Sequence, residues 1–202
     1  MTKRARLGVL FSLLWGLGAV ARADVVWTES VNGDFSNDGL SPTALTLGSG
    51  DNTIIGVTGN PGTGVDRDYF SINVPIGFVL RHVILLDNTT ISGGASFIGM
   101  QAGPQLTVQP TGAGSENLLG FAHYNSGMLG TDLLPFLAPS LALNGVSSGT
   151  YSFWVQELGG PVDYGFDFQL EPVPIPAAGL LLMSGTFGLA LLRRRRGALS
   201  LT

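Results

Sequence analysis

Uncharged apolar runs near both ends of this chain restrict the part that can fold as a globular domain to the residues between them. At the N-terminus, three basic residues within the first six positions precede the apolar run 7–20, and Ala21-Arg22-Ala23 follows it. A basic region, a short apolar stretch and an A-x-A site are typical of a secretory signal peptide. We therefore predict a signal peptide over residues 1–23, cleaved after Ala23. The alternative is an uncleaved anchor helix, for which this apolar run is short.

The second apolar run has a proline-rich entry and a basic exit. Pro172, Pro174 and Pro176 precede the uncharged run 177–192, and four consecutive arginines follow at 193–196. Proline fixes φ and lacks an N–H, so we expect an extended entry and a helix that begins near residue 177. Such a helix rises about 24 Å, near the lower limit for crossing the hydrocarbon core of a membrane. The arginines would stay on the cytoplasmic side, which leaves the residues before Pro172 outside.

A proline motif, a short transmembrane helix and an arginine cluster in this order resemble the PEP-CTERM class of sorting signals, most closely its VPLPA-CTERM variant. The residues that carry the resemblance are the motif Val173, Pro174, Ile175, Pro176 and Ala177, the helix 177–192, and the cluster Arg193, Arg194, Arg195 and Arg196. A short tail, 197–202, follows. The resemblance, which covers residues 172–196, implies recognition by an exosortase-type transpeptidase in the membrane, cleavage near the proline motif and delivery to the cell surface. An ordinary membrane anchor without processing is the alternative.

The region between the two apolar ends, residues 24–171, is strongly acidic. It contains all fourteen acidic residues of the chain but only Arg67 and Arg81 as basic ones, which gives a formal net charge of −12. This charge repels phosphate backbones, so we expect no nucleic-acid partner. The chain has no cysteine, which excludes disulfides and thiol catalysis. A region of this length can bury one hydrophobic core without them.

Short alternating or β-branched runs recur through residues 24–171, separated by Gly, Asn, Asp, Ser and Pro. This pattern indicates an all-β domain, a β-sandwich or a jelly roll, flanked by the N-terminal signal helix and the C-terminal transmembrane helix. We expect a loop over 31–42, and a short helical turn or a loop within 118–143. The predicted strands are 25–28, 43–47, 53–58, 68–74, 78–86, 95–100, 105–108, and a final pair, 150–158 and 164–170.

Two stretches of the middle region also resemble the pre-peptidase C-terminal type of β-sandwich. They are Asp51–Gly77, which contains a D-x-D-Y-F strand followed by V-P-x-G, and Gly149–Glu157, which contains a G-x-Y strand. The resemblance implies a β-sandwich that serves as an accessory or adhesive module of a secreted protein.

The polar residues favour a binding role over catalysis. His82 and His123 are isolated and have no zinc-site spacing. The acid pairs Asp66/Asp68 and Asp163/Asp167 have a spacing that glycosidases could use, but surface acids are the simpler interpretation. The loop 32–39 is rich in oxygen ligands, and Asp34, Asn37 and Asp38 form a candidate calcium site. Solvated turn acids are the alternative there.

The sequence therefore predicts an exported, non-enzymatic protein, and the PEP-CTERM resemblance implies that it belongs to the cell surface or extracellular matrix of a Gram-negative bacterium. Its expected partners are an exosortase-type transpeptidase, the membrane, and exopolysaccharide or other surface proteins. We assign no catalytic residues and no cofactor other than the candidate calcium ion. The alternatives are a secreted carbohydrate-binding or carbohydrate-active protein, and a plain membrane-anchored periplasmic domain.

Overall fold

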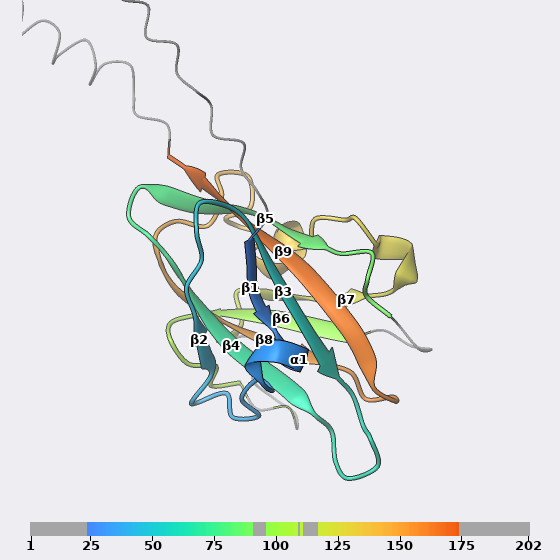
Figure 1. Ribbon diagram of the computed structural model, residues 1–202. Coiled ribbons are helices and arrows are strands. Elements are labelled where there is room, and N and C mark those ends of the chain that lie inside the picture. The colour runs from blue at the N-terminus through green and yellow to red at the C-terminus, as the bar shows by residue number, and fades with distance from the viewer. Residues whose placement is uncertain (1–23, 91–95, 109, 111–116, 174–202) are drawn as a thin grey trace, which may run out of the picture.

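The computed structural model describes residues 24–90, 96–108, 110 and 117–173 (Figure 1). These residues form a mostly β domain in which two mixed sheets pack together as a sandwich. The predicted signal peptide, the motif beyond Val173, the transmembrane helix and the arginine cluster lie outside the described residues. Within the described part of the chain, no helix is long and apolar enough to cross a membrane.

The first sheet has four strands in the order β1-β3-β9-β5. Strand β1 runs parallel to β3, whereas β9 is antiparallel to both β3 and β5. The strands of this sheet are β1 (Asp24–Thr28), β3 (Gly50–Thr58), β9 (Val162–Pro172) and β5 (Phe78–Leu85).

The second sheet has five strands in the order β2-β4-β8-β6-β7. Strand β2 runs parallel to β4, and the other pairs are antiparallel. Its strands are β2 (Thr43–Leu45), β4 (Arg67–Val74), β8 (Gly149–Gln156), β6 (Ser96–Ala102) and β7 (Gly120–Tyr124). The short helices α1 (Glu29–Asn32) and α2 (Leu134–Leu137) and a 3₁₀ turn at Ser126–Met128 lie between strands.

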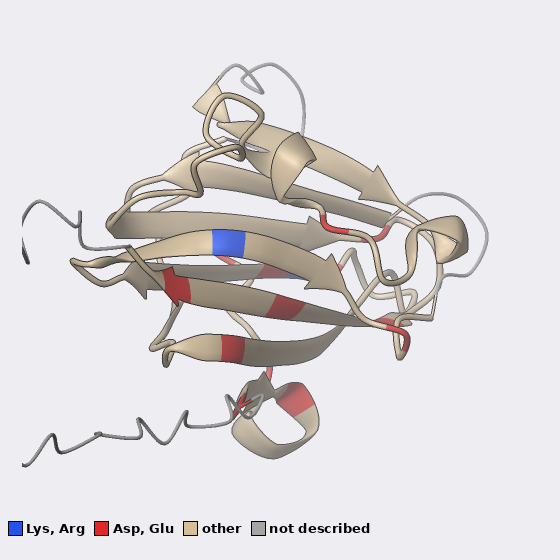
Figure 2. Ribbon diagram, turned by 90° about the horizontal axis from the view of Figure 1, so that it is seen from above, with Lys and Arg blue, Asp and Glu red and all other residues tan. Residues whose placement is uncertain are grey.

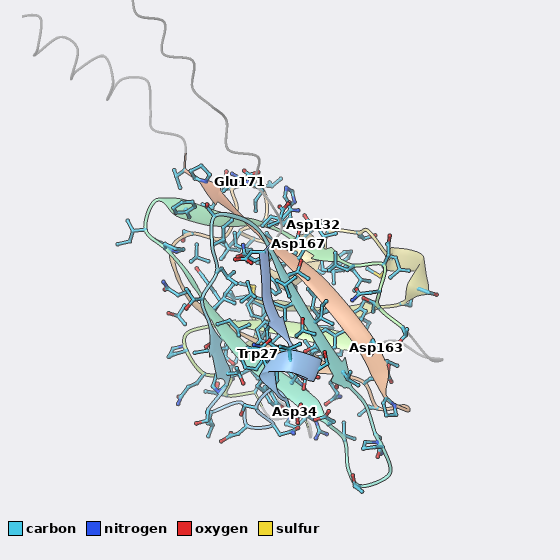
Figure 3. All side chains as sticks on the ribbon, in the orientation of Figure 1. Trp27, Asp34, Asp132, Asp163, Asp167 and Glu171 are labelled. Atoms are coloured by element: carbon cyan, nitrogen blue, oxygen red, sulfur yellow. The ribbon has the colours of Figure 1, made fainter. Side chains whose placement is uncertain are left out.

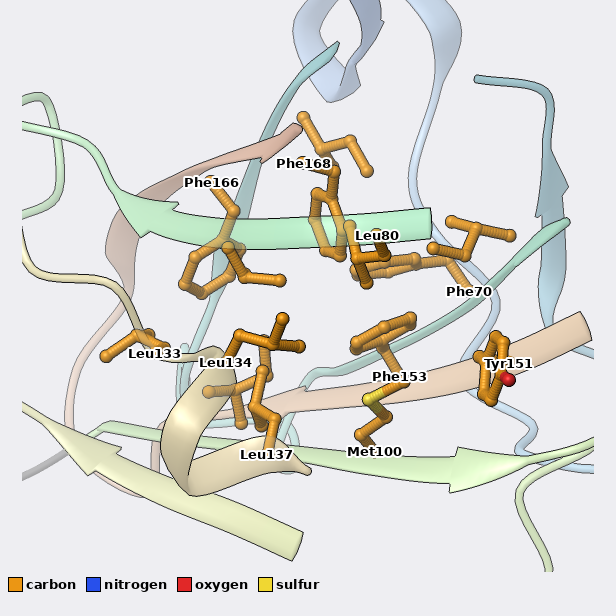
Figure 4. Packing of buried hydrophobic residues seen from close by; sticks show 14 of the residues in the cluster. Phe70, Leu80, Met100, Leu133, Leu134, Leu137, Tyr151, Phe153, Phe166 and Phe168 are labelled. Atoms are coloured by element: carbon orange, nitrogen blue, oxygen red, sulfur yellow. The ribbon is translucent and has the colours of Figure 1, made fainter. Parts of the chain in front are cut away.

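Aromatic side chains from both sheets meet in the core between them (Figure 4). Phe70 on β4 stacks on Phe153 on β8, with 5.3 Å between the ring centroids. Phe153 in turn meets Phe168 of the opposite sheet edge-on at 5.1 Å. Such pairs contribute about 0.5–1.5 kcal/mol each beyond their buried area. The alternation of apolar residues predicted this core because successive strand residues point to opposite faces of a sheet.

A second apolar cluster holds Tyr69, Leu106, Val108 and Trp154, which are all buried. The prediction of a strand over 105–108 was wrong, because this segment is irregular. Its Leu106 N–H donates to the Gly39 carbonyl, and its apolar side chains pack beside Tyr69 and Trp154. Apolar and polar residues alternate over 105–108 because this segment covers the face of a sheet. It does not form a strand of that sheet.

Two further details differ from expectation. The last two strands are not a pair: β8 is bonded to β4 and β6 in one sheet, and β9 to β3 and β5 in the other. Strand β7 lies where we expected a helical turn or loop, although α2 in the same stretch is the short helical turn that was predicted.

The first and last described residues lie at the same end of the four-stranded sheet (Figure 1). Asp24 lies across from Asn52, and Asn52 lies across from Phe168 near the end of β9. Strand β9 continues to Pro172, and the Val173 N–H donates to the Gly77 carbonyl. Both predicted apolar ends therefore connect to one end of the domain.

Candidate metal centre

Three carboxylates from separate elements converge at the turn that follows β1. They belong to Glu29 in α1, Asp34 in the loop after α1, and Asp68 in β4, and one oxygen of each lies within 4.8 Å of the others. Figure 3 places Asp34 beneath α1, near Trp27. We refer to these three residues as the carboxylate cluster.

The sequence after β1 folds into a tight turn that places Asp34 near Glu29. The Asn32 side chain accepts a hydrogen bond from the Thr28 N–H at 2.9 Å, and the Gly33 N–H donates to the Glu29 carbonyl. Gly33 has φ 93°, a left-handed conformation that glycine adopts at little cost. The Trp27 indole N–H donates to the Gly33 carbonyl at 3.1 Å and holds the turn against β1.

Glu29 is fixed by two backbone donors. Its Oε2 accepts the Val57 N–H at 2.7 Å, and its Oε1 accepts the Phe35 N–H at 3.2 Å. Partial burial raises the pKa of Glu29 to about 7, although these two hydrogen bonds work in the opposite direction. Each oxygen still has a free lone pair, so the carboxylate can bind a further ligand.

Asp68 is fully buried, and neither of its carboxylate oxygens has a hydrogen-bond partner. Burial, and then the negative charge of Glu29, raise the pKa of Asp68 to about 9. The Tyr164 side chain on β9 is also fully buried, and its hydroxyl lies beside Asp68 without forming a well-directed hydrogen bond. Burial raises the pKa of Tyr164 well above its usual range, so the hydroxyl is a neutral neighbour of the cluster.

No lysine or arginine of the described residues neutralises the cluster. Arg67 and Arg81 are the two such residues in the described ranges, and Figure 2 shows how far acidic positions outnumber basic ones. The Arg67 side chain donates to Gln156 and to the Val65 carbonyl, and Arg81 forms an ion pair with Glu171. In this part of the chain, the cluster is also the one group of three acidic or histidine side chains close enough to share a metal ion.

The residues of the predicted calcium site separate in the structure. Asp34 belongs to the carboxylate cluster, but Asp38 does not. The Asp38 Oδ1 accepts the Leu40 N–H at 2.9 Å, and the Asn37 Oδ1 accepts the Arg67 N–H at 2.8 Å. These two side chains stabilise the loop, while Glu29 and Asp68 take the places beside Asp34.

The other polar candidates from the sequence have structural partners. His82 lies 2.8 Å from Asp132, Asp167 accepts the Asn52 N–H, and the exposed Asp163 accepts the Thr90 hydroxyl. His123 is exposed and meets the rings of Phe97 and Phe121 edge-on.

The fold and the cluster together define a two-sheet, mostly β domain with a partly buried, acidic, candidate metal centre. No family model, no curated protein and no solved structure matches this chain. The resemblances noted for residues 172–196 and for the middle region therefore stay expectations from sequence.

Proposed function

We propose that this chain is an exported protein of the cell surface or extracellular matrix, sorted by an exosortase-type transpeptidase and without catalytic activity. The proposal includes the finer fold assignment, a β-sandwich or jelly roll flanked by a signal helix and a transmembrane helix. Its job would be structural or adhesive, through contacts with exopolysaccharide or with other surface proteins.

The position of the two ends of the domain is the observation that carries this proposal. Asp24 directly follows the predicted cleavage site, and Val173 begins the predicted sorting motif. Both lie at one end of the four-stranded sheet. A precursor with an apolar segment at each end can then insert both into one membrane while the sandwich stands clear of it. Ends on opposite sides of the domain would require a long linker, since an extended chain spans only about 3.4 Å per residue.

The carbohydrate-binding alternative needs exposed aromatic rings beside acidic groups. Trp154 is buried, and Trp27 is partly buried and stacks on Phe35. Asp68 and Asp167 are buried as well, whereas the exposed phenylalanine rings of the described residues are those of Phe121 on β7 and Phe136 on α2. The sandwich therefore gives this alternative less support than the structural role.

Mass spectrometry of the protein recovered from the cell surface and medium tests the proposal by mapping both mature termini. We expect a mature form that starts at Asp24, ends near Val173–Ala177 and lacks the arginines. Replacing Arg193–Arg196 with glutamine should leave an unprocessed precursor in the membrane, whereas deleting the tail 197–202 should leave processing intact. A mature form that keeps the apolar helix and the arginines would overturn sorting and indicate a plain anchor.

A further inference from the structure

We propose that Glu29, Asp34 and Asp68 bind one calcium ion, which joins the two sheets through the turn after β1. This inference is independent of sorting, because it rests only on residues within the sandwich.

The spacing of the three carboxylates fits a shared ion. Calcium binds oxygen ligands at about 2.3–2.6 Å, so two ligands on opposite sides of the ion are about 5 Å apart. The three oxygens of the cluster lie within 4.8 Å of one another, which places all of them inside this limit. The exposed position of Asp34 leaves room for water molecules to complete the coordination.

The buried groups beneath the cluster provide an independent observation. Asp68 has no exposed surface and two unpartnered oxygens, and one of them faces the carboxylates of Glu29 and Asp34. Buried polar atoms nearly always have a partner in folded proteins, so this carboxylate is placed to bind a ligand. With one Asp68 oxygen on the ion, the Tyr164 hydroxyl can donate to the other, which gives both unpartnered groups a partner.

The ligand chemistry favours calcium over other common metal ions. All three ligands are carboxylates, which are hard oxygen donors, whereas zinc sites usually include histidine or cysteine. Magnesium gives up its water reluctantly and requires near-ideal octahedral geometry. A ligand as buried as Asp68 requires an ion that loses water readily and accepts irregular geometry, and calcium does both.

The ion would hold together parts of the chain that belong to different sheets. Glu29 follows β1 of the four-stranded sheet and accepts the N–H of Val57 on β3, whereas Asp68 lies on β4 of the five-stranded sheet. Glu29 also accepts the N–H of Phe35, whose buried ring contacts Phe70 in the core. Binding would therefore fix the N-terminal turn across one side of the sandwich.

Calorimetric titration of the full chain in a non-ionic detergent, freed of metal with a chelator, tests the proposal. The probe is calcium chloride alone, with magnesium chloride as the comparison. We expect one saturable calcium site with a dissociation constant of about 10⁻⁴–10⁻³ M, the range of extracellular modules. Magnesium should bind much more weakly.

Isosteric variants assign the site to its residues. Asp68→Asn, Glu29→Gln and Asp34→Asn should each weaken calcium binding about tenfold or more, as the loss of a metal-site contact does. The matched control is Asp87→Asn, an exposed turn residue outside the cluster, which should bind like the parent chain. Because Asp34 is exposed, Asp34→Asn should fold normally, so the test does not depend on the buried variants.

Hydrogen exchange provides a second measurement, in which calcium should slow exchange of the Phe35 and Val57 amides in the parent chain and in Asp87→Asn, but not in the three cluster variants. Three results would each overturn the proposal. They are the absence of saturable binding, equal affinity for magnesium, and unchanged calcium affinity in Asp34→Asn.

Discussion

Asp68 should make the metal-free protein less stable as the pH rises. Its carboxyl has a pKa of about 9 in the folded chain, raised by burial and by the charge of Glu29, against a model-peptide value of 3.8. A raised pKa means that the folded state holds a proton that the unfolded state has lost. The stabilisation from this proton is complete below the unfolded pKa, and it is lost as the pH rises through the folded value.

The size of the effect follows from one proton taken up on folding. Between pH 6 and 8 the unfolded carboxylate is ionised and the folded carboxyl is mostly protonated, so the free energy of unfolding falls by about 1.4 kcal/mol per pH unit. The expected loss from Asp68 alone is about 3 kcal/mol over this range. The negative charges of Glu29, Asp66 and Asp34 are already among the causes of this raised pKa. Glu29, with a pKa of about 7, adds to the loss in the same direction.

Urea denaturation of the full chain with a chelator, at pH 6, 7 and 8, measures this loss. Asp68→Asn cannot ionise, so its unfolding free energy should fall far less, and Asp87→Asn should follow the parent chain. Saturating calcium should remove the fall, because the ion takes the place of the protons. The metal-free parent chain could instead prove equally stable at pH 6 and 8, or more stable at pH 8. That result would show that the folded state does not hold the extra proton on Asp68, and it would refute this prediction.

Three further predictions concern packing and are measured by urea denaturation at fixed pH. Phe153→Ala should lower the free energy of unfolding by about 3–5 kcal/mol, because the ring fills the space between the sheets; a loss below 1 kcal/mol would contradict the packing described. Gly120→Ala should destabilise by about 1–3 kcal/mol or more, because its Cβ would collide with the backbone carbonyl of Phe136 on α2, and an unchanged stability would refute this contact. Ser96→Ala should cost about 1–3 kcal/mol, because its hydroxyl donates to the buried Glu157 at 2.8 Å; a neutral result would show that Glu157 finds another donor.

The alternation of the long strands made most of the fold predictable. On β9, every second residue from Val162 to Leu170 is apolar and buried, which is the sequence pattern of a strand with one face on a core, although Gly165 and Asp167 between them are buried as well. The sheet that each strand joins was not predictable, because β8 and β9 have the same pattern and yet lie in different sheets. Strand β7 has only five residues, too few for its alternation to stand out.

The candidate site was predictable in part. Asp34 was recognised because acidic loop residues favour calcium, but Glu29 and Asp68 have no spacing to it that indicates a shared site. The turn at Gly33 places Asp34 beside Glu29, whereas Asp68 lies on a strand of the other sheet. Only the packing of the two sheets brings Asp68 to the other two carboxylates. Asn37 and Asp38 have the same ligand chemistry as Asp34, yet their oxygens are used by nearby backbone N–H groups.

The order of the strands has a consequence for when this chain can fold. The last two strands are interior ones: β8 lies between β4 and β6, and β9 lies between β3 and β5. Until residues 149–172 are available, both sheets lack the strand that connects their earlier members, and the long-range pairing that stabilises them cannot form. A nascent or partly translocated chain therefore stays unfolded until residues 149–172 have been synthesised or translocated. Under the proposed export route, this strand order keeps the precursor unfolded while it passes through a secretion channel, and folding is completed only on the outer side of the membrane.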